Sequence, residues 1–127
     1  MPSIMIVDDE ALVLFDLTLT VEDLGHDIFC EATNIDDALD ALEAGSPDAA
    51  LLDIDVGGTP VWPLARAVAR KECPIVFVSA NSRHEELKTE FAHCHVVDKP
   101  ASPTDISRAL ETALSRNTEQ IDQVTPA

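Results

Sequence analysis

Short apolar runs and segments of helical periodicity alternate five times along this chain. The runs have the length and residue types of strands, and the segments between them repeat apolar side chains every three or four positions. The expected strands are residues 3–7, 27–31, 49–53, 74–79 and 95–98, and the expected helices are residues 12–24, 34–45, 61–71, 82–91 and 102–114. This alternation predicts an α/β fold, a doubly wound five-stranded parallel sheet flanked by five helices.

Three of the expected helices also carry start signals. Asn34 is placed to cap the second helix, and Ser82 with Glu85 forms a capping-box pattern for the fourth. Ser102 followed by Pro103 is typical of the cap and first turn of the last helix. The boundaries of these helices therefore rest on local chemistry as well as on periodicity.

The length of 127 residues is that of one domain with a single core. We expect residues 1–116 to form this domain and residues 117–127, which are polar and show little periodicity, to form a C-terminal tail. Nothing in the sequence indicates a second domain.

The charge of the chain excludes several classes of partner. With 24 acidic and 8 basic residues, the formal net charge is −16, which repels nucleic-acid phosphates and anionic lipid. No apolar run approaches the roughly 20 residues of a membrane span, and the first residues lack the basic segment of a signal peptide. We therefore expect a cytoplasmic protein that binds neither nucleic acid nor membranes.

Polar side chains stand at the ends of four of the five expected strands. Asp8 and Asp9 follow the first strand, Asp53 ends the third, Ser79 ends the fourth and Lys99 follows the fifth. In the strand order 2-1-3-4-5, the second strand lies at an edge and the other four surround the point where strand order reverses. Ligands bind at that point in such sheets, so the sequence predicts one pocket that collects all five residues.

The chemistry of this pocket follows from its charge. Three carboxylates held close together repel one another unless a cation is present. Mg²⁺ prefers oxygen ligands and bridges carboxylates to phosphoryl oxygens, and Mn²⁺ can substitute for it. With the metal present, Asp53 is an ionised nucleophile, while Lys99 and the Ser79 hydroxyl can each hold a phosphoryl oxygen. The predicted chemistry is phosphoryl transfer, which depends mainly on positioning and charge.

Four short motifs in this arrangement give the chain a resemblance to response-regulator receiver domains over nearly its whole length. They are VDDE at residues 7–10, LLDID at 51–55, VSA at 78–80 and DKP at 98–100, each at the end of the corresponding strand. The resemblance implies a flavodoxin-like fold and a phosphoryl group passed to Asp53 from a histidine kinase or a histidine phosphotransfer protein.

The resemblance also implies a role for each pocket residue. Asp8, Asp9, Asp53 and the backbone carbonyl of Asp55 would hold the metal. Phosphate binding and switching fall to Ser79 and Lys99.

A single-domain response regulator of this kind signals through protein–protein contacts or acts as a phosphate shuttle or sink. It is not an enzyme beyond its own phosphorylation and dephosphorylation. In the family, a downstream target would contact the fourth helix, the fifth strand and the fifth helix, here residues 82–91, 95–98 and 102–114.

Two positions depart from the family pattern. Members usually carry Tyr or Phe three residues before the lysine, a ring that moves on activation, and this chain has Val96 there. Asp55 is acidic where many members have a neutral residue, which adds negative charge beside the phosphate. The usual ring movement therefore cannot operate, and the signal must pass through the loop after Ser79.

Two alternative functions remain open on the sequence alone. The Asp-x-Asp of Asp53 and Asp55 resembles the first motif of haloacid-dehalogenase phosphatases, although that family places the motif on its first strand and needs a further acidic pair downstream. The other alternative is a docking module that is never phosphorylated.

Overall fold

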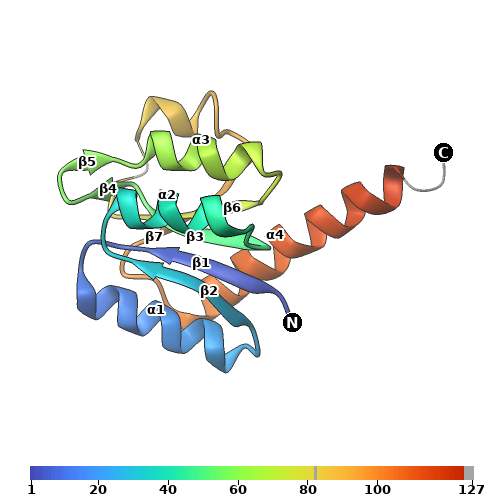
Figure 1. The fold of residues 1–127 in the computed structure, drawn as a ribbon, viewed down its shortest axis with the longest axis horizontal. Coiled ribbons are helices and arrows are strands. Elements are labelled where there is room, and N and C mark those ends of the chain that lie inside the picture. Colours follow the sequence, from blue (N-terminus) through green and yellow to red (C-terminus); the bar gives the residue numbers. More distant parts are fainter. Residues whose placement is uncertain (82, 125–127) are drawn as a thin grey trace.

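The computed structural model describes residues 1–81 and 83–124, and for residues 116–124 the backbone alone. Five parallel strands form one sheet in the order β2-β1-β3-β6-β7, which is the predicted order. Figure 1 shows this sheet between two layers of helices. The strands are β1 (Ser3–Val7), β2 (Asp27–Ala32), β3 (Ala49–Asp53), β6 (Ile75–Ser79) and β7 (His95–Asp98).

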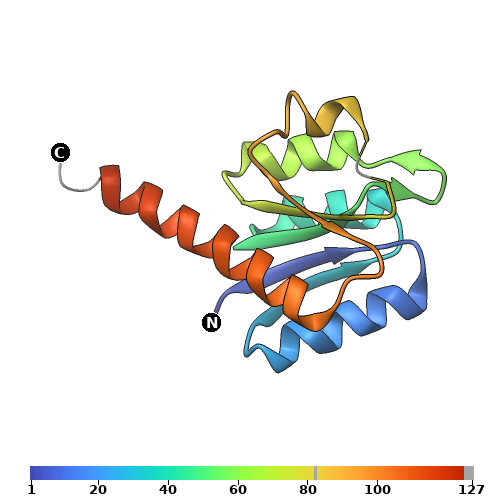
Figure 2. The same cartoon turned by 180° about the vertical axis from the view of Figure 1, so that it is seen from behind.

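Four α-helices cover the sheet in the described residues, two on each face (Figures 1 and 2). Side chains of α1 (Ala11–Asp23) and α4 (Pro103–Val124) pack in one core cluster, and those of α2 (Ile35–Ala44) and α3 (Trp62–Arg70) pack in the other. Two caps form as predicted. The amide of Asp37 donates to Asn34 Oδ1 at 2.8 Å, and the amide of Asp105 donates to Ser102 Oγ at 3.1 Å.

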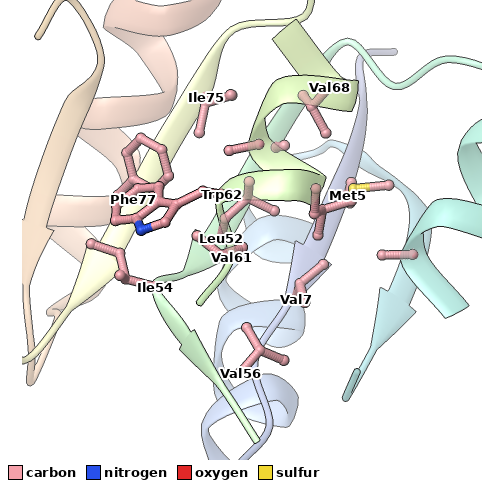
Figure 3. Packing of buried hydrophobic residues seen from close by; sticks show 14 of the residues in the cluster. Met5, Val7, Leu52, Ile54, Val56, Val61, Trp62, Val68, Ile75 and Phe77 are labelled. Atoms are coloured by element: carbon pink, nitrogen blue, oxygen red, sulfur yellow. The ribbon is translucent and has the colours of Figure 1, made fainter. Parts of the chain in front are cut away.

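The strands supply both cores because successive side chains point to opposite faces of the sheet. In β1, Ile4 and Ile6 face α1 and α4, whereas Met5 and Val7 face α2 and α3. Figure 3 shows the second of these clusters, with Met5 and Val7 beside residues of β3, β6 and α3. All five residues of β3 are buried, as expected for a central strand covered on both faces.

The predicted helix over residues 82–91 is wrong, so the described chain has four α-helices and not five. The described part of that segment folds as turns around one 3₁₀-helix, η1 (Glu85–Leu87). Leu87 and Phe91 are the only apolar residues in the segment, too few for the stripe that holds a surface helix to a core. Ser82, half of the predicted capping box, lies outside the described residues.

The last helix is longer than predicted. It continues past Leu114 to Val124, and its C-terminal part projects away from the sheet in Figures 1 and 2. The domain boundary at residue 116 stays a prediction. Among the described residues, no helix combines the length and apolar character needed to cross a membrane.

Candidate functional site

The predicted pocket residues meet at the carboxyl edge of the sheet. Lys99, which directly follows β7, places its Nζ 2.9 Å from Asp8 Oδ2 and 3.4 Å from Asp53 Oδ1. Asp8 is fully buried, and Asp53 and Ser79 are 7% and 4% exposed. Residues up to 91 positions apart are therefore brought together by the strand order alone.

The lysine is held in its charged form. Burial lowers the pKa of Lys99, but its hydrogen bond to Asp8 and the negative charges of Asp53 and Asp8 outweigh burial, so the pKa lies above its ordinary value. A cation is therefore fixed between the two buried carboxylates over the whole physiological pH range.

The surroundings of Asp53 favour its neutral form, whereas those of Lys99 favour the charged form. Burial is the main cause that raises its pKa from 3.8 to about 6, and the charge of Asp8 and the nearby Asp9 carboxyl raise it further, against the effect of Lys99. The excess of negative charge around Asp53 is the feature that a bound cation would relieve.

This raised pKa predicts a pH-dependent stability in metal-free buffer. Because the folded pKa of Asp53 exceeds the unfolded value, the native state binds the proton more tightly and stability falls as pH rises from about 3.8 to about 6. Relative to Asp53→Asn, the wild type should lose up to about 3 kcal/mol of unfolding free energy over this window. Urea unfolding at pH 4 to 7 in EDTA measures this difference, and parallel curves for the two proteins would contradict it.

The carboxylates of Asp8, Asp9 and Glu10 form an acidic group beside Asp53. Asp8, Asp9 and Glu10 each place one carboxylate oxygen within 4.8 Å of the others. Asp8 Oδ1 accepts the amide of Glu10 at 2.9 Å, and Asp9 Oδ2 accepts the amide of Gly57 at 3.0 Å. An all-oxygen donor set with two exposed members fits Mg²⁺, which keeps several of its own waters. The sequence analysis did not assign Glu10, although the VDDE motif contains it.

Residues 55–60 form a two-stranded hairpin that the sequence analysis missed. It pairs β4 (Asp55–Val56) with β5 (Thr59–Pro60) through Gly57 and Gly58, which both have positive φ, at 63° and 80°. A two-residue hairpin turn of this kind requires positive φ at both positions, which glycine adopts without strain. The turn directs the Gly57 amide to Asp9, and the adjacent glycines were the available signal.

The structure places Asp55 in this hairpin with its side chain exposed. Its backbone carbonyl as a metal ligand stays a prediction. The Asp-x-Asp motif begins at the end of the third strand and continues into the hairpin, so it does not occupy the first strand as the phosphatase alternative would require.

The Ser79 hydroxyl is engaged by the following loop. Ser79 Oγ donates to the carbonyl oxygen of Asn81 at 2.8 Å and accepts the Asn81 amide at 3.0 Å. On the neighbouring strand, Val96 is half-buried, pairs with Phe77 in the sheet and packs against the core on that face. A group that drew the Ser79 hydroxyl toward Asp53 would have to break its bond to Asn81.

A parallel α/β sheet with buried carboxylates and a lysine at its carboxyl edge is suited to phosphoryl-transfer chemistry. Residues 4–111 match the family described as the response regulator receiver domain, and the chain belongs to that family. Receiver domains are modules of two-component signalling that take up a phosphoryl group and bind Mg²⁺ at an acidic pocket.

Individual relatives agree with this assignment. The transcriptional regulatory protein PdtaR of Mycobacterium tuberculosis is 31% identical over 117 residues, which cover 89% of this chain and 57% of PdtaR. The chain thus spans little more than half the length of the curated relatives it matches. Two solved structures are also similar, one being SdrG of Sphingomonas melonis Fr1 (29% identity, TM-score 0.77, 90% and 97% of the two chains). The other is the signal receiver domain of a modulated diguanylate cyclase from Desulfovibrio desulfuricans G20 (26%, 0.82, 94% and 98%).

Proposed function

We propose that this protein is a phosphoacceptor in which Asp53 takes a phosphoryl group from a phosphohistidine of a histidine kinase or phosphotransfer protein. The observation that carries the proposal is the position of the buried Asp53 carboxylate, 3.4 Å from Lys99 and next to the exposed edge of the acidic group. The phosphorylated protein would then signal through contact with a partner protein, or it would serve as a shuttle or sink for phosphate.

Each pocket residue has a definite task in this reaction. A carboxylate oxygen of Asp53 bonds to phosphorus as the bond from the donor histidine nitrogen to phosphorus breaks. Lys99 offsets charge on a phosphoryl oxygen, and the Ser79 hydroxyl donates a hydrogen bond to another. Mg²⁺ held by Asp8, Asp9 and Glu10 would neutralise the phosphoryl oxygens, with Asp53 and the Asp55 carbonyl as the further predicted ligands.

The outer face of α1 supports a helical protein as the donor. Leu12, Phe15 and Leu19 are exposed large apolar residues at helical spacing, beginning directly after the acidic group. The α1 sequence contains acidic residues and no Lys or Arg. A partner helix with an apolar stripe and basic flanks fits this surface, and it would bring its histidine to the mouth of the pocket.

The test compares two donors by intact mass. Acetyl phosphate, which is too small to use the α1 surface, should add one phosphoryl group in Mg²⁺ and none in EDTA. With phosphorylated histidine kinases as donors, Phe15→Ser should slow transfer about tenfold or more, the effect of losing one interface anchor, while the rate with acetyl phosphate stays the same. Mass gain in EDTA, or equal slowing with both donors, would contradict the proposal.

A further inference from the structure

The segment between β6 and β7, described at residues 80, 81 and 83–94, contacts α3 through two α3 side chains that are one helical turn apart. Trp62 lies parallel to the ring of Phe91, with ring centroids 5.7 Å apart and an interplanar angle of 17°. Arg66 forms a two-pronged ion pair with Glu90, with nitrogen–oxygen distances of 2.8 and 3.0 Å. The ion pair is nearly half exposed, so solvent screens it and it stabilises the contact little. The buried Trp62 ring is therefore the main contact between α3 and this segment.

Trp62 also contacts the part of the segment closest to the pocket. The Trp62 and His84 rings have their centroids 5.7 Å apart at an interplanar angle of 70°. The Trp62 and Phe77 rings have centroids 5.8 Å apart at an angle of 66°, and Phe77 belongs to β6. Figure 3 shows Trp62 and Phe77 side by side in the core. Trp62, in α3, thus contacts both the core strand β6 and the loop after Ser79.

One short backbone route leads from the phosphorylation site to Trp62. Ile54, which follows Asp53, accepts the amide of Val61 at 2.8 Å through its carbonyl oxygen, and Trp62 is the next residue. The hairpin between them is tied to the acidic group by the bond from Gly57 to Asp9. The backbone beside Asp53 is thus joined to the first turn of α3 by one hydrogen bond.

A second route leads from the switch hydroxyl to His84. Ser79 Oγ holds both the amide and the carbonyl of Asn81, and Asn81 Oδ1 accepts the amide of Arg83 at 3.0 Å. His84 follows Arg83 directly. The two routes, one from Asp53 and one from Ser79, meet at the contact between Trp62 and His84.

We propose that Trp62 performs the readout that the missing ring at position 96 performs elsewhere in the family. The inference rests on the proposed function, because it needs a phosphoryl group on Asp53 to recruit the Ser79 hydroxyl. Recruitment breaks the bond from Ser79 to the Asn81 carbonyl and releases the loop. His84 then moves relative to the Trp62 ring, while Phe91 keeps the far end of the segment anchored in the core.

The test uses Trp62 as its own probe, since it is the only tryptophan in the chain. Beryllofluoride with Mg²⁺ stands in for the phosphoryl group, and its binding is followed separately by ¹⁹F NMR. Binding should change both the Trp62 fluorescence and the single indole N–H signal of the wild type. Ser79→Ala and His84→Ala should bind beryllofluoride yet lose most of both changes.

Two matched control variants, His95→Ala and Arg70→Gln, separate this readout from a general structural effect. His95→Ala removes an exposed histidine on β7 and should keep the wild-type response. Arg66→Gln should speed amide hydrogen exchange in residues 84–91, whereas Arg70→Gln, the same change one turn further along α3, should leave exchange unaltered. Equal effects of the two arginine variants would show that the ion pair of Arg66 with Glu90 does not hold this segment against α3.

The outcomes also distinguish this inference from the function on which it rests. If ¹⁹F NMR shows beryllofluoride bound while Trp62 fluorescence and the indole signal stay unchanged, the readout proposal fails and the phosphoacceptor proposal stands. If beryllofluoride does not bind, both fail. If Ser79→Ala keeps the full Trp62 response, the route from Ser79 is wrong.

Discussion

Asp53→Asn should abolish phosphorylation by every donor. The side chain keeps its size and its place between Lys99 and the acidic group, but an amide cannot form the acyl phosphate bond. Removing one of the crowded carboxylates should also stabilise the metal-free protein at neutral pH, because burial and the charge of Asp8 hold the pKa of Asp53 at about 6. Intact mass after acetyl phosphate treatment should therefore show one added group in the wild type and none in the variant.

The matched control is Asp55→Asn, two residues further along the chain. Asp55 is an exposed residue of the β4–β5 hairpin, and only its backbone carbonyl is predicted to act in the pocket. This variant should still gain one phosphoryl group, although the rate can change with the local charge. Phosphorylation that survives Asp53→Asn and disappears in Asp55→Asn would move the acceptor to Asp55.

The sheet could be predicted because its strands follow strong local rules. The bounds of β1, β3 and β7 agree with the sequence prediction, and the parallel pairing of the strands follows from a chain that alternates strand and helix. β3 is apolar up to Asp53, so burial on both faces ends where the site begins. Because ligands bind at the carboxyl ends of parallel strands, the strand ends alone were enough to group Asp8, Ser79 and Lys99 at one edge.

The prediction of a helix over residues 82–91 failed because its evidence was local. A capping-box pattern and a run of charges are compatible with a helix, but they do not supply an apolar face. Phe91 instead packs on Trp62, and Glu90 pairs with Arg66, so contacts with a residue pair in α3 decide the conformation. Such long-range contacts leave no periodic trace in a single sequence.

In the candidate site, the sequence did not reveal which backbone groups form hydrogen bonds with the pocket side chains. Charge and strand position pointed to the ionisable residues, but not to Asn81, whose backbone holds the Ser79 hydroxyl. Nor did they show that the Gly57 amide binds Asp9. Backbone groups donate and accept regardless of residue type, so their role becomes visible only with the three-dimensional path of the chain.

Lys99→Met should have the second large effect, on both phosphorylation and stability. Lys99 pairs with Asp8, which is fully buried, so the substitution leaves a buried carboxylate without its cation. In metal-free buffer the unfolding free energy should fall by about 3 kcal/mol, the order seen when one partner of a buried pair is removed. Phosphorylation by acetyl phosphate should slow by about 100-fold or more, because a positioned charge on the phosphoryl oxygens is lost.

A double variant distinguishes loss of the pair from loss of packing. Asp8→Asn combined with Lys99→Met removes both charges, so most of the lost stability should return if the uncompensated carboxylate is the cause. Lys88→Met, at an exposed position after η1, should change stability by less than about 0.5 kcal/mol. Urea unfolding of the wild type, Asp8→Asn, Lys99→Met and the double variant measures the coupling between Asp8 and Lys99. If the double variant is as unstable as Lys99→Met, the lysine stabilises the fold through its packing, and its ion pair with Asp8 contributes little.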